Sequence, residues 1–338
     1  MMSVKCIDMY CHWLPAGLAE KIAAKTNAPL HMFQRARSIP IMENLDLRFA
    51  LMDSFPGYRQ VPSMVSPPME MMGDASVTPE LAKYANEYMA EIARKHPDYF
   101  PGFVASLPMN NPEAAVLEAE RAIRTLGAKG VQIFTNMNGK PVDHPEFMPL
   151  YEKMAELDYP IWLHPSRGID FADYASEKHS KHEIWWSIGW PYETSAAMLR
   201  LAFSGIFDRW PHLKIITHHA GGMIPMMEGR LGAGMEVYGS RTPEHLKDAA
   251  YVPLKERPLD AIRRFYADTA TFGSKMAMEI GLQFFGLSHT LFATDMPFDP
   301  EKGPRFIRET IKMVQEMELS EQDKERILYG NASDLLKL

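Results

Sequence analysis

The chain has 338 residues, a length that suits one (β/α)₈ barrel with insertions. Its hydrophobic fraction of 46% supports a large core, and its net charge of −7 argues against a nucleic-acid-binding protein. Cys6 and Cys11, the two cysteines, lie in one short segment, so we expect no secreted disulfide framework. The sequence shows no signal-peptide pattern and no run of about 18 apolar residues. We therefore expect a cytoplasmic protein without a membrane span.

Short β-rich runs alternate with helical stretches along the chain. Most of these runs are apolar throughout, as expected for parallel strands that are covered on both faces. Strand and helix repeated about eight times predict an α/β fold, a closed (β/α)₈ TIM barrel with rim insertions, formed as one domain by residues 1–338. An open doubly wound sheet is the alternative, but no G-x-G-x-x-G follows the first run. The expected strands are Val4–Met9, Val61–Val65, Gly102–Ser106, Gly130–Phe134, Pro160–Leu163, Leu213–Thr217, Phe265–Asp268 and Thr290–Ala293.

The expected helices begin with recognisable signals. Thr78 and Asn111 are expected N-caps, because each precedes a proline at the first helical position. Three stretches fit the repeat poorly and are expected to be insertions or long connections on the barrel rim, namely Asn27–Ser54, Ser66–Val77 and Pro165–Gly189. The expected helices are Leu45–Ser54, Pro79–His96, Pro112–Leu126, Phe147–Leu157, Tyr192–Phe203, Pro258–Arg264, Gly303–Glu316 and Glu321–Leu328.

Histidines and an aspartate follow several of the expected strands, where (β/α)₈ barrels carry their reactive groups. His12 follows the first strand and His164 ends the fifth. His219 follows the sixth strand and Asp295 ends the eighth. Four strand ends that each supply a His or an Asp are hard to explain by packing, and imidazole with carboxylate suits Zn²⁺, Mn²⁺ or Fe²⁺. His218 is expected to point elsewhere, because adjacent residues on a strand face opposite ways.

Each of these residues also has a structural interpretation. His164 could cap the loop that Pro165 turns, and Asp295 could form an Asx turn at the start of a proline-containing loop. His219 could be a metal ligand, a general base or a structural histidine. The Gly-Gly pair that follows it indicates close approach of the backbone to something bound.

Motifs of a known superfamily run from end to end of the chain. They are Asn86–Phe103 (NEYMAEIARKHPDYFPGF), Leu126–Phe134 (LGAKGVQIF), Ile161–Pro165 (IWLHP), His219–Pro225 (HAGGMIP) followed by Gly229–Arg230, Tyr266–Thr269 (YADT), Thr294–Pro297 (TDMP) and Gly330–Ala332. With these motifs the chain resembles the aminocarboxymuconate-semialdehyde decarboxylase branch of the amidohydrolase superfamily. That branch, also called amidohydrolase 2, includes γ-resorcylate and other hydroxybenzoate decarboxylases.

The resemblance implies a role for each strand-end residue. The family's histidine lies six residues before the proline of its motif, so its counterpart is His219 and not His218. In the family this histidine works near the metal on the substrate or on bound water. Asp295 resembles the family's metal-binding and proton-handling aspartate. His12 and His164 resemble two of its metal ligands.

One position departs from the family's pattern. Family members have His-x-His or Glu-x-His at the end of strand one, whereas this chain reads Tyr10-Cys11-His12. Three outcomes are open: Tyr10 binds the metal, the metal keeps only His12, His164 and Asp295 with waters, or the metal is weak or absent. We favour the second, because three protein ligands and a water suffice for catalytic zinc, while a neutral phenol with a pKa of about 10 is a weak ligand. The expected cofactor is one divalent ion, with zinc favoured and manganese as the alternative.

For a hydroxybenzoate-type substrate, the resemblance implies non-oxidative decarboxylation. The metal would bind the carboxylate and the ortho-hydroxyl, and Asp295 would protonate the ring carbon that bears the carboxylate. Trp186, Trp190 and Tyr192 could wall a flat apolar pocket, although ordinary packing explains each of them equally well. Arg230 resembles an arginine that reaches a neighbouring subunit's substrate carboxylate, and a surface ion pair is its alternative. The resemblance also implies a homodimer or homotetramer.

Two other functions stay open. A hydrolase or hydratase of the same fold would attack an amide, a lactone or a C=C bond with metal-activated water and His219 as the base. The change at Tyr10 makes this alternative more credible. A non-catalytic barrel that binds a small aromatic acid would need no metal, but the intact His164, His219 and Asp295 argue against it. The fold alone does not decide among these functions.

Overall fold

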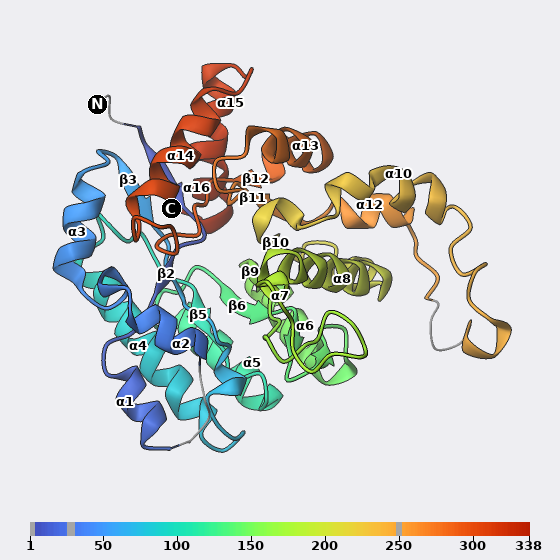
Figure 1. The fold of residues 1–338 in the computed structure, drawn as a ribbon, viewed down its shortest axis with the longest axis horizontal. Helices are drawn as coiled ribbons and strands as arrows, with labels where there is room; N and C mark the ends of the chain where they lie inside the picture. Colours follow the sequence, from blue (N-terminus) through green and yellow to red (C-terminus); the bar gives the residue numbers. More distant parts are fainter. Residues whose placement is uncertain (1–3, 26–30, 248–251) are drawn as a thin grey trace.

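The computed structural model describes residues 4–25, 31–247 and 252–338. In these residues, short parallel strands occupy eight positions at the centre of the molecule (Figure 1). Six positions form one sheet in the order β12-β11-β10-β9-β6-β5, and the other two are each split, so that β1 pairs with β3 and β2 with β4. The strands are β1 (Cys6–Asp8), β2 (His12–Trp13), β3 (Tyr58–Gln60), β4 (Ser63–Met64), β5 (Ala105–Ser106), β6 (Val131–Phe134), β9 (Ile161–His164), β10 (Ile215–Thr217), β11 (Tyr266–Asp268) and β12 (Thr290–Leu291), with a separate hairpin of β7 (Asn136–Met137) and β8 (Lys140–Pro141).

Backbone hydrogen bonds close the barrel at its two seams. Met9 N donates to Phe292 O at 2.9 Å, which joins the first strand position to the eighth. Val104 N donates to Pro62 O at 3.0 Å, which joins the second position to the third. The predicted barrel is confirmed, and each predicted strand has a counterpart. The second strand position begins earlier than predicted, at Tyr58.

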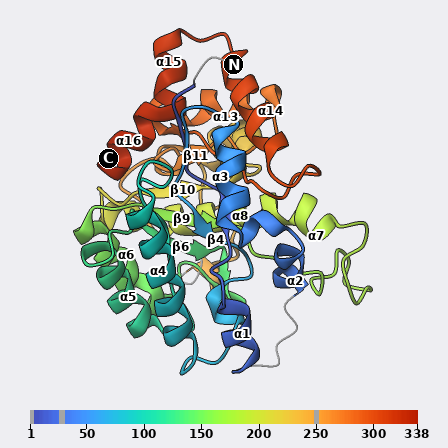
Figure 2. The same cartoon turned by 90° about the vertical axis from the view of Figure 1, so that its left-hand side faces the viewer.

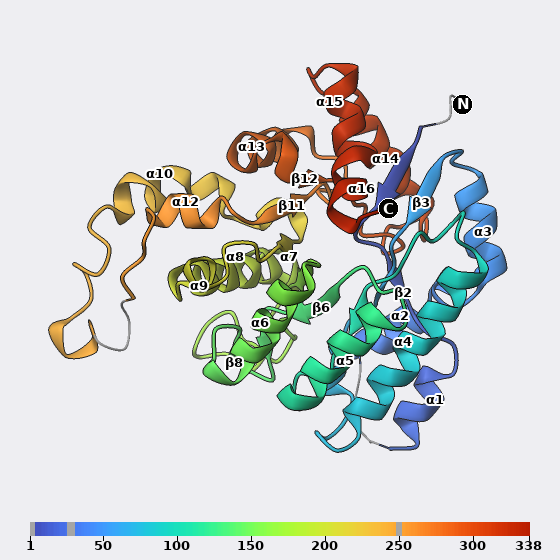
Figure 3. The ribbon, with the colours of Figure 1, turned by 180° about the vertical axis from the view of Figure 1, so that it is seen from behind.

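Helices surround the strands. Figure 2 shows α4, α5 and α6 side by side on one flank, and Figures 1 and 3 show the segment with α10 and α12 extending away from the barrel. None of the helices in the described part of the chain has the length and hydropathy that a membrane span needs. The helices are α1 (Leu18–Ala23), α2 (His31–Arg37), α3 (Leu45–Asp53), α4 (Thr78–Lys95), α5 (Pro112–Arg124), α6 (Met148–Leu157), α7 (Ile184–Ser187), α8 (Gly189–Phe203), α9 (Ile206–Arg209), α10 (Glu228–Leu231), α12 (Pro258–Ile262), α13 (Lys275–Phe285), α14 (Pro304–Gln315), α15 (Glu321–Glu325) and α16 (Asn331–Leu336).

Each predicted helix has a counterpart, but one predicted N-cap is wrong and several helices were not predicted. Asn111 caps α5 as predicted, since its side chain accepts from Ala114 N at 3.2 Å. Thr78 is not an N-cap: it lies inside α4, and its hydroxyl donates to Asn110 Oδ1 at 2.6 Å instead. Among the unpredicted helices α13 is the longest, and a glycine in its middle lowers helix propensity. That residue, Gly281, is where the helix packs against the turn after β10, and a Cβ there would lie 3.2 Å from the Ala220 side chain.

The insertion before the second strand position is tied directly to the barrel. Residues 27–30 of this stretch lie outside the described residues, and α2 and α3 make up most of the rest. Arg48 of α3 is fully buried; its Nη1 donates to His12 O and its Nε to Gln60 Oε1, both at 2.7 Å. The insertion therefore stabilises the end of the strand that carries His12.

The barrel interior is filled by side chains, as in other barrels of this type. Trp162 of β9 lies at its centre and donates from Nε1 to Met9 O at 2.6 Å, across the barrel. Gly130 makes room for this indole, because a Cβ at that residue would lie 2.4 Å from Trp162 Cζ3. The barrel interior beneath the strand ends is therefore filled by side chains, and a ligand can bind only above the strand ends.

Glu70 is a buried carboxyl group in the loop that follows the second strand position. Its Oε1 has no hydrogen-bond partner among the described residues, and burial raises its pKa from 4.5 to about 8. The folded protein therefore retains a proton that the unfolded chain releases above about pH 4.5. The contribution of this proton to the free energy of unfolding is fully present below the pKa that Glu70 has in the unfolded chain. This contribution is lost as the pH rises toward 8.

We expect Glu70→Gln to remove this pH dependence. The free energy of unfolding of the wild type should fall, relative to the variant, by up to about 1.4 kcal/mol per pH unit between pH 4.5 and 8, because glutamine stays neutral. Urea denaturation of both proteins from pH 5 to 9 measures the difference, with Glu325→Gln at an exposed carboxylate as the control. A difference that stays constant over this range would show that Glu70 ionises normally in the folded protein.

Candidate metal centre and active-site pocket

The C-terminal ends of three strand positions bring His12, His164 and Asp295 together. His12 Nε2 lies 3.0 Å from Asp295 Oδ1, and the rings of His12 and His164 are 5.3 Å apart. All three side chains are buried. The fold therefore gathers the three residues that the sequence analysis predicted as metal ligands.

Asp295 is held at the turn that follows β12. Its backbone has a φ of 62°, and its N–H donates to Tyr10 O at 2.9 Å. Burial alone would raise the pKa of Asp295, yet the three imidazoles that face it hold that pKa well below its ordinary value. Asp295 is therefore a carboxylate at neutral pH.

His164 is fixed by one hydrogen bond. Its Nδ1 donates to the Pro165 carbonyl at 2.7 Å, which leaves Nε2 with its lone pair toward the cluster. Burial, with His12 and His218 nearby, lowers the pKa of His164 well below its usual range. Burial also lowers the pKa of His12. Both imidazoles are therefore neutral and able to bind a cation at neutral pH.

His218 was predicted to point away from the site, and that prediction is wrong. The ring is fully buried inside the cluster; Nδ1 lies 2.5 Å from Asp268 Oδ2, and Nε2 lies 3.4 Å from Asp295 Oδ1. His218 keeps the extended backbone of β10, with φ −89° and ψ 156°, so its ring points inward, and the backbone turns only at His219, which has a φ of 54°. The two imidazoles consequently stack, with centroids 3.7 Å apart.

The protonation of His218 is set by its carboxylate neighbours. Burial alone would lower its pKa, but Asp268 and Asp295 raise it to about 9. In the absence of a cation, Nε2 therefore holds a proton at neutral pH. That proton would have to leave before a cation could bind there.

His219 lies at the edge of the cluster. Its Nε2 is 3.4 Å from Asp295 Oδ2, and its side chain is 13% exposed. Burial, with His218 alongside, lowers its pKa, so the ring is neutral at neutral pH. A neutral imidazole that is partly open and faces a carboxylate can accept or pass on a proton.

The two glycines after His219 were predicted to approach something bound, but they approach the protein itself. A Cβ at Gly221 would lie 2.6 Å from Phe285 Cζ in α13. A Cβ at Gly222 would lie 2.5 Å from Pro191 O in α8, and the φ of 64° also disfavours other residues. These contacts set the position of the turn that carries His219.

Tyr10 lies against the cluster without a polar partner. Its ring stacks on His218 at 3.9 Å, and among the described residues its Oη has no hydrogen-bond partner. Burial, with Asp268 and Asp295 nearby, raises its pKa well above 10, so it is a neutral phenol. Cys11 packs in a different cluster of the core from Tyr10.

The donor atoms fit a divalent cation. Ligand atoms of His12, His164 and His218 lie within 4.8 Å of one another, and so do those of His218, His219 and Asp295. Three neutral or deprotonable imidazoles and a carboxylate, with a buried His218 Nε2 that has no hydrogen-bond partner in the described part of the chain, form a donor set of the kind that binds Zn²⁺ or Mn²⁺.

A cavity of about 480 Å³ opens above the cluster, with His219 and Asp295 at its base. Trp186 and Trp190 line it, as predicted. Tyr192 does not line it and is 56% exposed, because it lies on the outer side of the α8 N-terminus. Several further residues of the wall were not predicted, because they come from α2, α7, α14 and loops that share no motif: Arg35, Trp185, Phe272, Phe298, Arg305 and Phe306.

A family model described as Amidohydrolase matches residues 7–338. The chain belongs to the amidohydrolase family. It is 31% identical over 260 residues to 2-amino-3-carboxymuconate-6-semialdehyde decarboxylase from Dictyostelium discoideum, covering 77% of this chain and 67% of that protein. It is 30% identical over 310 residues to γ-resorcylate decarboxylase from Polaromonas sp., covering 88% of this chain and 89% of that protein.

A solved structure extends the comparison to the metal. Dihydroxybenzoic acid decarboxylase from Polaromonas sp., with bound manganese and the inhibitor 2-nitroresorcinol, has a TM-score of 0.79 and 27% identity over 100% of this chain and 98% of that one. The resemblance to the decarboxylase branch is thereby confirmed. Together with the His and Asp cluster, the comparison supports a single divalent metal in this amidohydrolase.

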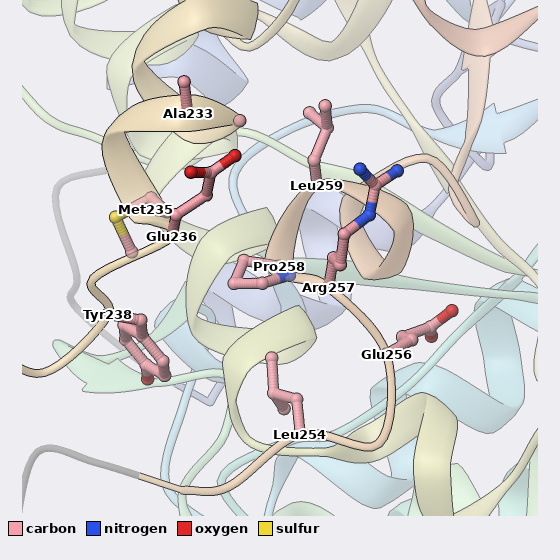
Figure 4. Close-up of a pocket in the computed structure, with 10 residues that line it drawn as sticks. Ala233, Met235, Glu236, Tyr238, Leu254, Glu256, Arg257, Pro258 and Leu259 are labelled. Carbon is pink, nitrogen blue, oxygen red and sulfur yellow. The ribbon is translucent and has the colours of Figure 1, made fainter.

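The extended segment of this amidohydrolase holds a second cavity, of about 400 Å³ (Figure 4). Its lining comes from residues 232–238 and 254–259, away from the strand ends. Arg230 is exposed on α10 at the base of the same segment and does not line the cavity above the metal cluster. Its predicted reach into a neighbouring subunit stays a prediction.

We expect Gly222→Ala to disturb the site. The new Cβ would meet the Pro191 carbonyl, and the backbone conformation would add strain of about 1–3 kcal/mol, so the His219 turn should shift and the protein should lose stability. Thermal denaturation and a crystal structure of the variant measure the two effects. Gly229→Ala is the matched control, since its Cβ would meet nothing within 4 Å. Equal melting temperatures for the two variants would contradict this account.

Proposed function

We propose that this amidohydrolase-family protein is a metal-dependent, non-oxidative decarboxylase of a small hydroxy-aromatic carboxylic acid. The observation that carries the proposal is an aromatic-walled cavity that opens onto a buried cluster of imidazoles and a carboxylate. The relatives support it, because three that match along most of the chain are named as decarboxylases. They favour decarboxylation over the hydrolase and hydratase alternatives.

The cavity suits a flat aromatic acid. Its volume of about 480 Å³ lies within the range of small-molecule sites, and it admits a single substituted ring. Trp190 packs edge-on against His164 at 5.6 Å, Phe298 lies 5.6 Å from His12, and both rings line the cavity. A substrate ring between such side chains would place its polar groups toward the cluster and its apolar face against the walls.

Two cationic groups give the cavity a preference for anions. Arg35 and Arg305 line it, and in the described residues neither guanidinium forms an ion pair with a carboxylate. Arg35 instead lies over the Phe298 ring at 5.6 Å. Arginine is suited to carboxylates and phenolates because its planar donors can bind both oxygens of a carboxylate. We propose that these arginines attract the acid and bind a substituent away from the reacting carbon.

His12, His164 and Asp295 would hold the metal in this proposal. When bound, the metal would hold the substrate's carboxylate and ortho-hydroxyl in place and take up negative charge. Zinc stays the first candidate because imidazole suits it, and manganese is the alternative because the Polaromonas decarboxylase carries it.

Asp295 and His219 would move the proton. Asp295 begins as a carboxylate, so it can accept the proton of the substrate's ortho-hydroxyl and return it to the ring carbon that bears the carboxylate. The bond from that carbon to the carboxylate then breaks, its electron pair stays in the ring, and CO₂ leaves. The product is a phenolate. It regains a proton from solvent through His219, whose Nε2 faces Asp295 Oδ2 at the cavity wall.

Two properties stay predictions from the sequence. A homodimer or homotetramer is proposed on the family resemblance, in which Arg230 would reach a partner's substrate. A cytoplasmic location likewise stays a proposal.

Asp295→Asn should abolish turnover. An amide can neither accept nor return the proton, so kcat should fall by at least about 100-fold, the lower end of what general acid–base groups contribute. Release of CO₂ from 2,6-dihydroxybenzoate measures it, with the metal content of each preparation determined in parallel. Asp260→Asn, at an exposed ion pair, is the control. Full turnover by the Asp295 variant would remove this residue from the mechanism.

Removal of the metal should stop the reaction and lower stability. A metal that binds only the folded protein stabilises it by mass action, so chelation should lower Tm as well as activity. Re-addition of Zn²⁺ or Mn²⁺ should restore both, and the ion that restores the higher kcat identifies the working metal.

A substrate screen separates the decarboxylase from the hydrolase. A set of ortho-hydroxybenzoates is assayed for release of CO₂, and a set of lactones is assayed for release of acid. Turnover of lactones alone would replace the decarboxylase proposal with the hydrolase alternative.

A further inference from the structure

We propose that His218 is a ligand of the metal and that Tyr10 is not. The proposal rests on the proposed function only in requiring a bound divalent cation. It adds a fourth protein ligand that the sequence analysis placed outside the site, and it gives the two adjacent histidines different roles. His218 would bind the cation, and His219 would remain free to act on the substrate.

The position of His218 Nε2 is the first argument. This atom is fully buried and has no hydrogen-bond partner among the described residues. It lies 3.4 Å from Asp295 Oδ1, and His12 Nε2 lies 3.0 Å from the same oxygen. Ligand atoms about 2.0–2.1 Å from a tetrahedral zinc are roughly 3.3 Å from one another. Both distances to Asp295 Oδ1 match that spacing, and ligand nitrogens of His12 and His218 lie within 4.8 Å of each other.

The hydrogen bond at the other ring nitrogen is the second argument. Metal-binding histidines commonly donate their second N–H to a carboxylate or a backbone carbonyl, which fixes the ring and makes it a better ligand. His218 Nδ1 has such a partner in Asp268, and His164 Nδ1 has one in the Pro165 carbonyl. Both rings therefore present Nε2 toward the same cluster.

Backbone hydrogen bonds hold the Asp268 carboxylate in position beside His218. Its Oδ1 accepts from Ala220 N at 3.2 Å and from Ala270 N at 3.0 Å, while Oδ2 faces His218. The Asp268 carboxylate is fully buried, and both of its oxygens already have partners in the protein. Neither oxygen is therefore available to a ligand in the cavity. Asp268 is therefore a positioning residue for His218, not a catalytic residue.

Tyr10 contributes its ring instead of its oxygen. The phenol lies parallel to the His218 imidazole, with centroids 3.9 Å apart and planes 14° apart. His219 covers the opposite side of the same imidazole at 3.7 Å. The His218 ring is thus clamped between two others, and its orientation is fixed before a cation arrives. The change to tyrosine at position 10, together with a second histidine after β10, moves one ligand from the first strand to the sixth.

Metal affinity tests the assignment without relying on turnover. We expect His218→Ala to weaken binding of Zn²⁺ and Mn²⁺ by at least about 100-fold, since it removes a ligand, and Asp268→Asn by about 10–100-fold. Tyr10→Phe is the matched control, because it keeps the stacked ring and removes only the oxygen; its affinity should stay within about threefold of the wild type. Competition with a chromophoric chelator measures all four proteins. Wild-type affinity in His218→Ala, or loss of the metal in Tyr10→Phe, would overturn the proposal.

A measurement on the unmodified protein covers the case in which His218→Ala fails to fold. X-ray absorption of the zinc-loaded wild type should show three imidazoles on the metal, where a site without His218 would show two. Tyr10→His in the His218→Ala background should recover the third imidazole. Two imidazoles in the wild type would refute this assignment and leave the decarboxylase proposal standing. A wild type that binds no metal would refute both.

Discussion

The hydrogen bonds to Asp8 hold the barrel seam on which the rest of the site depends. This buried carboxylate accepts from Tyr10 N and Thr294 N through Oδ1 and from the hydroxyls of Tyr58 and Thr294 through Oδ2. It therefore links the first strand position to both of its neighbours. Burial raises the pKa of Asp8 to about 7, and these donors oppose the rise. Because the same bonds fix the backbone next to Tyr10 and Asp295, the seam and the metal cluster form one unit.

The sequence predicted the parts of this unit that follow strand periodicity. The eight strands were visible as apolar runs, and the strand ends marked His12, His164 and Asp295 correctly as neighbours. The prediction failed at His218, because it took His219 as the inward-facing residue, whereas His218 keeps the extended backbone of β10 and the chain turns only at His219. No local pattern signals that turn; it depends on glycines that contact α8 and α13, helices distant in the sequence.

The cavity wall was harder to predict for a related reason. Trp186 and Trp190 could be named because they lie in or next to the long connection that follows β9, whereas Arg35 and Arg305 come from opposite ends of the chain. Such residues carry no shared motif, and only the closed barrel brings them to one rim. Tyr192 shows the converse error. Its place in the sequence resembles that of Trp190, but two residues along a helix rotate the side chain to another face, toward solvent.

Charge balance explains why an imidazole suits the cluster better than a phenolate. Asp268 and Asp295 place two negative charges on buried side chains, and buried charges are stable only when they are paired. A divalent cation with neutral histidines neutralises this pair completely. A phenolate at Tyr10 would add a third negative charge and leave the loaded site with one in excess. With His218 as a ligand, the site gains a fourth donor at no cost in charge. An incoming aromatic acid then meets a centre with one anionic protein ligand, Asp295, instead of two.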